Sequence, residues 1–386
     1  MTENTSTALI KSQTISPALA RVSGQLAVTE RLLEKPVEPI LIPYRKGGKW
    51  GFCDVKGNIK IPCVYAEVGF FENNGVVTFR EGYGWYGLLN KQGQIVVPAI
   101  YDYIGPYSEG LWCVWSNSTN LLKAVDENGI EVMQCQLDHF DHDTHETAFH
   151  DGLVKVGNLG GMYGYVNRNG SLEIPYQFPD ADDFHDGLAP VSEYFGDGEY
   201  GYGYIDKKGQ WVVDPVFGSA SKFSYGWGVL STRSYVSKWG KLLDPFTTAR
   251  SFSDGMGNVQ GGSKWGYIDT TGEITINFKF EAPADFSEGL APAKLNGKWG
   301  YIDKKGQVVI PCQFDFANEF KDGFAAVKFD GEYDDEYGVI DTKGDWAFYP
   351  GSFSLKNIGD GIFQIITDKP EGYVHALTSS WFFFND

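Results

Sequence analysis

The sequence lacks the segments that would place a chain in or across a membrane. It contains no apolar run of about eighteen residues, the minimum for a membrane-spanning helix. The start, Met1-Thr2-Glu3-Asn4, does not open a basic region followed by an apolar stretch and a cleavage site. We therefore expect a cytoplasmic protein.

Cysteine is scarce and scattered. The five residues are odd in number and include no Cys-x-x-Cys pair; they are Cys53, Cys63, Cys113, Cys135 and Cys312. This pattern predicts neither a disulfide framework nor a zinc ribbon.

Basic residues are outnumbered. The chain has 32 Lys and Arg against 50 Asp and Glu, a formal net charge of −18. Such a surface repels phosphate backbones and anionic lipids, so we expect no nucleic acid and no membrane partner. It would attract a basic protein, although acidity can also serve solubility alone.

Catalytic and cofactor motifs are missing as well. The sequence has no Gly-x-Ser-x-Gly, no P-loop, no dinucleotide-binding glycine motif and no His-Glu-x-x-His. We therefore expect no enzymatic activity and no cofactor.

What the sequence does contain is glycine, aromatics and a repeat. Its 48 glycines and 16% aromatic residues favour β structure with many turns. The repeat is clearest from Trp299 to Pro311, followed by Phe320-Lys321-Asp322-Gly323, and a degenerate copy falls at Leu122-Lys123. Its aromatic-glycine pairs are Trp50-Gly51, Tyr86-Gly87, Tyr163-Gly164, Tyr202-Gly203, Trp239-Gly240, Trp265-Gly266, Trp299-Gly300 and Tyr337-Gly338.

The string Trp-Gly-Tyr-Ile-Asp-x-x-Gly-x-x-Val-Ile-Pro, followed by an aromatic-x-x-Gly-Leu-Ala, resembles the bacterial WG-repeat family. The resemblance implies a bacterial β-repeat protein used for binding. It implies no shared catalytic residues.

Each repeat predicts about three antiparallel strands. The Asp-x-x-Gly segments suit type I turns. Turn formation therefore explains the spacing of acids such as Asp303, and no series of calcium-binding or catalytic carboxylates is needed. Pro311 and its equivalents should end the second strand. The aromatic at Phe320 should anchor the core before a third strand.

These units must stack on one another to bury their faces. The fold class we expect is all-β, an open curved array of about nine to ten three-stranded repeats over residues 49–386. The alternative is a closed β-propeller, to which Tyr101-Asp102-Tyr103 would contribute a short fourth strand. The spacing from Gly240 to Gly255 is short, so we expect a missing return strand and a kink near residue 240.

Residues 1–48 form an N-terminal extension. Ser16 and Pro17 suit the start of a short helix that runs to about Lys35. We expect it to cap the first repeat or to dock on another protein.

Two long hairpin tips mix aromatics with acids and are our candidate partner-binding residues; the competing interpretation is a solvated loop. They are Tyr194, Phe195, Asp197, Glu199, Tyr200, Asp330, Glu332, Tyr333, Asp334, Asp335 and Glu336.

The third repeat holds a histidine-rich insertion. His139, His142 and His145, with nearby carboxylates, are a candidate site for zinc or another divalent ion. A polar loop without metal is the competing interpretation.

The function expected from these features is a non-enzymatic scaffold that binds a basic protein, one form being an immunity protein that neutralises a toxin. The alternative is carbohydrate or cell-envelope binding, since 11 tryptophans and 22 tyrosines could stack on sugar rings.

Overall fold

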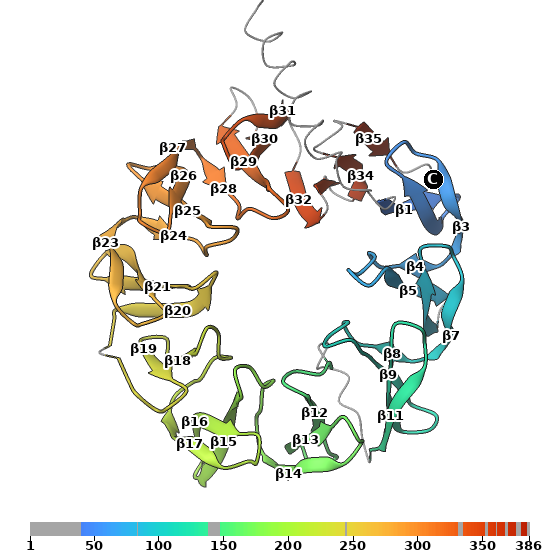
Figure 1. Cartoon of the computed structure of the whole chain (residues 1–386), viewed down its shortest axis with the longest axis horizontal. Helices are drawn as coiled ribbons and strands as arrows, with labels where there is room; N and C mark the ends of the chain where they lie inside the picture. Colours follow the sequence, from blue (N-terminus) through green and yellow to red (C-terminus); the bar gives the residue numbers. More distant parts are fainter. Residues whose placement is uncertain are drawn as a thin grey trace, which may run out of the picture.

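The computed structural model describes residues 40–82, 84–137, 147–243, 245–330, 335–351, 354–359, 361–366, 370–375 and 380–383. These residues form ten small antiparallel sheets arranged in a closed ring (Figure 1), and none of them is helical. The expected open array is therefore wrong, and the alternative, a β-propeller, is the fold. The helix predicted between Ser16 and Lys35 lies outside the described residues.

The sheets follow one another along the chain, and each is built from consecutive strands. The first five are β1 (Leu41–Lys46), β2 (Lys49–Asp54), β3 (Ile59–Tyr65); β4 (Glu67–Val68), β5 (Val76–Glu81), β6 (Trp85–Asn90), β7 (Ile95–Tyr101); β8 (Tyr103–Ile104), β9 (Trp112–Ser116), β10 (Leu121–Val125), β11 (Glu131–Gln136); β12 (Leu153–Gly157), β13 (Tyr163–Asn167), β14 (Leu172–Phe178); and β15 (Leu188–Gly196), β16 (Glu199–Asp206), β17 (Trp211–Phe217).

The other five sheets are β18 (Trp227–Leu230), β19 (Ser234–Ser237); β20 (Thr248–Ser253), β21 (Met256–Gly261), β22 (Lys264–Asp269), β23 (Ile274–Phe280); β24 (Ala282–Pro283), β25 (Leu290–Leu295), β26 (Lys298–Asp303), β27 (Val308–Phe314); β28 (Phe316–Ala317), β29 (Phe324–Asp330), β30 (Asp335–Asp341), β31 (Trp346–Gly351); and β32 (Ser354–Gly359), β33 (Ile362–Ile366), β34 (Pro370–His375), β35 (Ser380–Phe383).

A short extra strand distinguishes these sheets from the expected three-stranded units. Six of the ten sheets have four strands. In four of those six the first strand has only two residues, as in β8, where Tyr103 pairs with Trp115. The Tyr101-Asp102-Tyr103 segment thus contributes the fourth strand that the propeller alternative required. Strand pairing also begins at Leu41, upstream of residue 49.

The Asp-x-x-Gly turns form as predicted. Asp303 accepts the backbone N–H groups of Lys305 (3.0 Å) and Gln307 (2.8 Å) on Oδ1, and the Gly306 N–H bonds the Asp303 carbonyl oxygen at 2.8 Å. Gly306 has φ 74°, a conformation that glycine adopts without strain. Turn chemistry therefore accounts for these acids.

The proline prediction needs correction. Strand β27 continues through Pro311 to Phe314, but its pairing with β26 shifts register between Trp299 and Tyr301. Pro311 thus lies in a bulge of an edge strand, where a missing N–H costs no ladder bond. The bulge also explains the motif glycine, because a Cβ at Gly300 would lie 2.5 Å from the Ile310 carbonyl oxygen.

Neighbouring sheets share their cores. Tyr267, from β22, is buried in a cluster with Phe286 and Ile302 from the following sheet. Its hydroxyl donates to the Ala284 carbonyl oxygen at 3.0 Å, and Tyr301 donates in the same way to Asn318 at 2.8 Å. Burial raises the pKa of both hydroxyls well above its ordinary value, so both stay protonated donors.

The ring closes through side chains. Ile362 of β33 packs in a buried cluster with Ile42 of β1 and Cys53 of β2, which joins the last sheet to the first. Because each junction repeats similar contacts, each sheet is rotated similarly from the one before it. The chain therefore returns on itself after ten sheets instead of extending as an open array.

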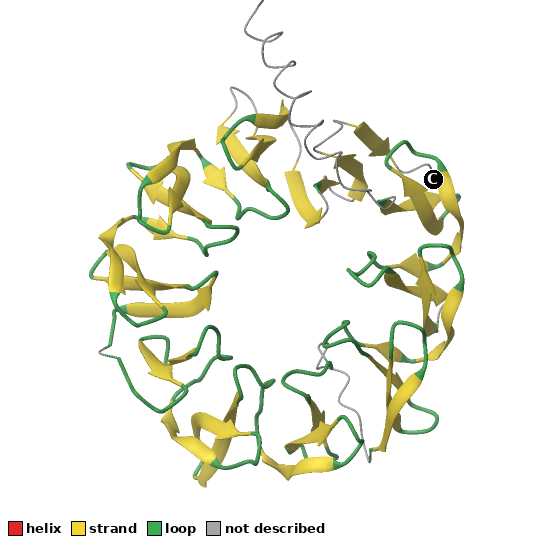
Figure 2. Ribbon diagram, viewed as in Figure 1, coloured by secondary structure: helices red, strands yellow, loops and turns green. Residues whose placement is uncertain are grey.

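The ring has two faces that differ in their connections. Consecutive antiparallel strands place successive connections at alternate ends of a sheet. One face, the turn face, therefore carries the Asp-x-x-Gly turns and the aromatic-x-x-Gly turns; the other, the hairpin face, carries the hairpins of variable length. Figure 2 shows loops from successive sheets projecting toward the centre of the ring.

Candidate functional site

The aromatic-x-x-Gly turns link each sheet to the next on the turn face. In Ser287-Glu288-Gly289-Leu290, Glu288 (φ 54°) and Gly289 (φ 81°) both have positive φ, as in a type I′ turn. In five of these turns the acid accepts the N–H of the glycine in the next turn. The pairs are Glu109 with Gly152, Asp151 with Gly187, Asp186 with Gly226, Asp254 with Gly289, and Glu288 with Gly323, at 2.6–3.1 Å.

Serine hydroxyls add a second link between turns. Ser253 donates to the Phe286 carbonyl oxygen at 2.8 Å, and Ser287 donates to that of Phe320 at 2.6 Å. Some turn acids also hold a cation: Lys304 Nζ lies 2.8 Å from Asp254 Oδ1. We call this series of acid–glycine bonds the turn ladder, and its role is to fix sheet to sheet.

The turn ladder is interrupted at the sheet of β18 and β19. Tyr225 replaces the acid, so no described carboxylate accepts the Gly255 N–H. The junction is otherwise regular, because Ser224 donates to the Phe252 carbonyl oxygen at 2.9 Å, as Ser287 does to Phe320. Tyr225 therefore occupies the position of Glu288.

The same sheet corrects our assignment of the sixth repeat. Trp239-Gly240 is not its opening aromatic-glycine pair: Tyr235 lies in the strand and is buried like Tyr267. Gly240 has φ 78°, and its N–H bonds the Ser237 carbonyl oxygen at 2.8 Å, as in the Asp-x-x-Gly turns. The predicted loss of a return strand is confirmed, since the described residues form only two strands here.

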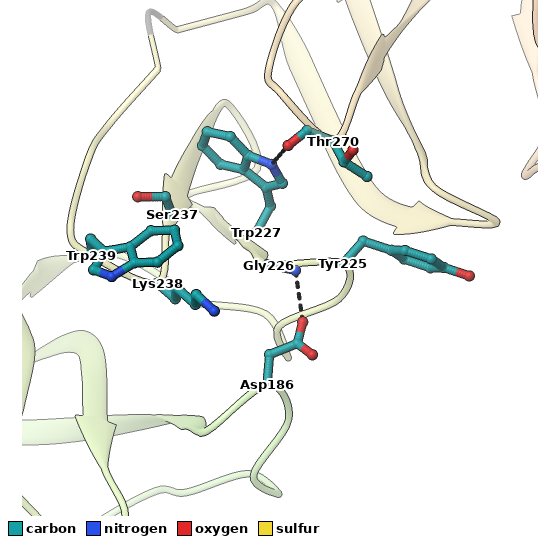
Figure 3. Close-up of a pocket in the computed structure, with 8 residues that line it drawn as sticks. All are labelled: Asp186, Tyr225, Gly226, Trp227, Ser237, Lys238, Trp239 and Thr270. Carbon is teal, nitrogen blue, oxygen red and sulfur yellow. Dashed lines mark hydrogen bonds between the residues drawn. The ribbon is translucent and has the colours of Figure 1, made fainter.

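A cavity of about 430 Å³ opens beside this sheet. Figure 3 shows Trp239 at one end and Tyr225 at the other, with Trp227 between them. Trp227 is 6% exposed, and its indole N–H donates to the Thr270 carbonyl oxygen at 2.9 Å. Trp239 is 79% exposed and Tyr225 52%. The cavity thus has a fixed aromatic base and an exposed tryptophan on one side, while the Tyr225 ring lies at its edge and points away from Trp239 (Figure 3).

Opposite charges border the cavity. Asp186 accepts the Gly226 N–H on Oδ2 at 2.7 Å, and within the part of the chain that the structure describes it forms no ion pair. Lys238 Nζ lies 4.5 Å from the centre of the Trp239 ring. The cavity therefore offers one carboxylate and one ammonium group whose formal charges cancel.

The first predicted partner-binding tip is on the hairpin face, between β15 and β16. Tyr194 is 50% exposed, Phe195 56% and Tyr200 54%. The rings of Tyr194 and Tyr200 are 4.9 Å apart, and the Tyr194 hydroxyl accepts the Gly198 N–H at 3.3 Å. These contacts bring the aromatics together. We call them, with Glu193, Asp197 and Glu199, the tip cluster.

The acids of the tip cluster are exposed. None of Glu193, Asp197 and Glu199 forms an ion pair with a described residue. The tip therefore presents an apolar centre with free carboxylates around it.

The second predicted tip is described only in part. Asp330 pairs with Asp335, and Phe329 with Glu336, in the backbone ladder of β29 and β30. Three further residues of this tip, Glu332, Tyr333 and Asp334, lie outside the described residues. The structure therefore does not show whether the residues of this tip form a site.

The predicted metal ligands His139, His142 and His145 also lie outside the described residues. Among the residues that are described, no group of three or more His, Cys, Asp or Glu side chains is placed to hold a metal ion. His150 and His185 do meet, with ring centres 4.8 Å apart, and His150 Nε2 is 3.7 Å from Asp183 Oδ2. Burial lowers the pKa of His185.

The sequence analysis missed the residues of the cavity. These residues, Asp186, Tyr225, Lys238 and Trp239, come from two neighbouring sheets. We treated the turns of Asp186 and Tyr225 as architectural, and we assigned Trp239 to the aromatic-glycine pair that opens a repeat. One signal was available, because Tyr225 and Trp239 are aromatic at positions where the other turns carry polar residues.

Comparisons with known proteins agree with the repeat. A family model described as "WG containing repeat" matches residues 50–85, 86–114, 163–193, 202–230, 265–299 and 299–333. No curated protein matches the sequence. Within the described residues, no helix is long and apolar enough to span a membrane.

Several solved structures are similar in part. The computationally designed Ika8 protein has 14% identity and a TM-score of 0.38, covering 75% of this chain and 96% of that one. Dihydro-heme d1 dehydrogenase NirN in complex with DHE has 12% identity and a TM-score of 0.33, covering 90% and 79%. Kluyveromyces lactis Hsv2p has 10% identity and a TM-score of 0.31, covering 78% and 88%. At such scores these likenesses carry no argument.

Proposed function

Since the chain belongs to the WG-containing-repeat family, we propose that it is a non-catalytic scaffold whose hairpin face binds a basic protein partner through the tip cluster. One concrete form is an immunity protein that occupies a toxin domain. The observation that supports this most directly is the exposure of Tyr194, Phe195 and Tyr200 beside three unpaired acids.

The chemistry of the tip cluster suits such a partner. Tyrosines and phenylalanine provide a large contact area with few rotatable bonds, and they are enriched where interfaces gain most of their energy. Carboxylates at the rim of an interface act mainly on the association rate. The net charge of −18 adds a long-range field that draws a cationic protein toward the ring.

The test begins with capture of partners from the source organism at low and at high salt, followed by affinity measurements with the purified partner. Tyr194→Ala, Phe195→Ala and Tyr200→Ala combined should raise the Kd at least tenfold, about 1.4 kcal/mol. Glu193→Gln, Asp197→Asn and Glu199→Gln combined should mainly slow association and flatten its dependence on salt.

Trp239→Ala, on the turn face, is the control and should bind like the wild type. Absence of any retained partner at either salt, or equal binding by the triple alanine variant, would overturn the proposal.

A further inference from the structure

The sheet of β18 and β19 carries two changes that its own fold does not require. Its Asp-x-x-Gly-like turn has Trp239 where the equivalent position in the other described turns is polar: Lys56, Gln92, Asn128, Asn169, Lys208, Thr271, Lys305 and Lys343. Its aromatic-x-x-Gly turn has Tyr225 where the others carry Glu109, Asp151, Asp186, Asp254, Glu288 and Asp322. Both aromatics line the same cavity.

Neither aromatic belongs to the buried core. Trp239 is 79% exposed, so it leaves most of a large apolar surface in water. Tyr225 is 52% exposed and takes the place of an acid that elsewhere links two sheets. Two exposed aromatics at positions that are otherwise polar indicate a surface that something else covers.

The cavity itself is preformed. Trp227 is buried and tied to Thr270 of the next sheet, and Asp186 is held from the preceding sheet by its bond to Gly226. Its volume of about 430 Å³ lies within the roughly 300–1,000 Å³ that small-molecule sites occupy. Three successive sheets therefore fix its walls before any ligand arrives.

The polar groups define the class of ligand. Asp186 can only accept hydrogen bonds, the Lys238 ammonium can only donate, and the exposed Thr270 hydroxyl can do both. An anionic ligand would be repelled by Asp186 and by the net negative charge of the chain, and a cationic ligand would be repelled by Lys238. A neutral molecule with many hydroxyl groups satisfies both side chains, and the C–H face of a sugar ring packs on an aromatic side chain.

We propose that this cavity is a binding site for a neutral oligosaccharide, with Trp239 as the stacking surface inside it and Asp186, Lys238 and Thr270 as hydrogen-bonding partners. The Tyr225 ring, which points outward from the edge of the cavity (Figure 3), is a second stacking surface for a sugar unit that extends beyond that edge. Lys238 covers one face of the Trp239 ring at 4.5 Å, and the ring presents its remaining surface to the ligand. The site lies on the turn face, so it acts independently of the tip cluster on the hairpin face.

The experiment is calorimetric titration of the full chain with neutral trisaccharides of glucose, mannose, galactose, xylose and N-acetylglucosamine. At least one should bind with a Kd of about 1 mM or below. Trp239→Lys restores the residue type of Lys208 and Lys305, and it should weaken that binding at least tenfold. Asp186→Asn should weaken it severalfold.

Trp85→Lys is the matched control, because Trp85 is a 57% exposed tryptophan at the start of β6, next to a hairpin. It should bind like the wild type. The proposal is overturned if no trisaccharide binds at about 10 mM, if Trp239→Lys binds as tightly as the wild type, or if Trp85→Lys loses binding equally. The tip-cluster triple alanine variant should keep sugar binding, so failure of this site and failure of the protein-binding proposal are distinguishable.

Discussion

The sheet of β24 to β27 and the sheet of β18 and β19 are built from the same repeat, yet they use their aromatic residues in opposite ways. In the first, Tyr301 is fully buried and Trp299 packs against the core it shares with the next sheet. In the second, Tyr235 is equally buried, but Trp239 and Tyr225 are exposed on the turn face. The buried tyrosine belongs to the architecture, and the exposed pair does not.

The two sheets differ in the same way in their turn acids. Glu288 in the regular sheet bonds Gly323 of the next turn, whereas Tyr225 in the two-stranded sheet makes no equivalent bond. The propeller thus tolerates one interrupted link and one missing return strand, and a cavity lies where both occur. The comparison suggests that stability comes from the repeated positions and binding from the positions that depart from them.

The largest expected effect comes from removing a buried aromatic of the regular sheets. Phe286 is 1% exposed and its ring centre lies 5.0 Å from that of Tyr267. Phe286→Ala should lower the free energy of unfolding by about 3–5 kcal/mol, because it leaves a cavity in a shared core. Trp239→Ala should change it by less than about 0.5 kcal/mol.

Urea unfolding followed by circular dichroism measures both variants. A loss of stability in Trp239→Ala similar to that in Phe286→Ala would show that Trp239 is structural, and the comparison between the two sheets would fail.

A smaller effect is expected from the turn ladder, and it should depend on pH. Burial tends to raise the pKa of Asp254, but the hydrogen bonds from Lys304 and Gly289 and the charge of Lys304 outweigh it, so the pKa lies below its ordinary value of 3.8. The ionised form thus stabilises the folded state above that value, and the contribution is lost as the pH falls through the lowered pKa.

Asp254→Asn should therefore cost about 1 kcal/mol at neutral pH, a modest amount because the Asp254 and Lys304 side chains are 32% and 43% exposed. The difference in free energy of unfolding between Asp254→Asn and the wild type should disappear as the pH falls below about 3.8. Asp197→Asn, which changes an exposed acid of the tip cluster, is the control and should unfold with the same free energy as the wild type. If the stability loss of Asp254→Asn did not depend on pH, the charge of Asp254 would not be its cause.

Much of this fold could be predicted from the sequence, because the responsible signals are local. The Asp303 turn and the core position of Phe320 follow from spacing within one repeat, and both are confirmed. Ring closure could not be predicted in the same way. It depends on the rotation between neighbouring sheets, which is set by packing among side chains such as Tyr267 and Ile302 that are distant in the sequence.

The cavity was missed for a different reason. Trp239-Gly240 has the same residue types as the aromatic-glycine pair that opens a repeat. The sixth repeat was therefore aligned incorrectly with the others, and Trp239 was assigned to a strand. Aligning Ser234-Tyr235-Val236-Ser237 with Gly203-Tyr204-Ile205-Asp206 instead places Trp239 in the turn. Only the structure could show that Trp239 lies near Asp186 and Thr270, because those two residues come from the two adjoining sheets.

The smallest expected effect has the opposite sign. Tyr225→Asp supplies the missing acid, and the bond from Ser224 to Phe252, which matches that from Ser287 to Phe320, places that acid where it can accept the Gly255 N–H. The gain in free energy of unfolding should be only about 0.5 kcal/mol, because the new hydrogen bond forms at a partly exposed site and the half-buried Tyr225 ring is lost. Tyr225→Ala should give no gain, and the measurement is again urea unfolding.

The same Tyr225→Asp variant should lose oligosaccharide binding, because it removes one stacking surface and adds a charge beside Asp186. A variant that is more stable but binds less would show that Tyr225 serves ligand binding. It would also show that its presence costs the protein one stabilising bond of the turn ladder. If Tyr225→Asp instead destabilises the chain, Tyr225 contributes to folding, and the division between repeated and departing positions would not hold at this junction.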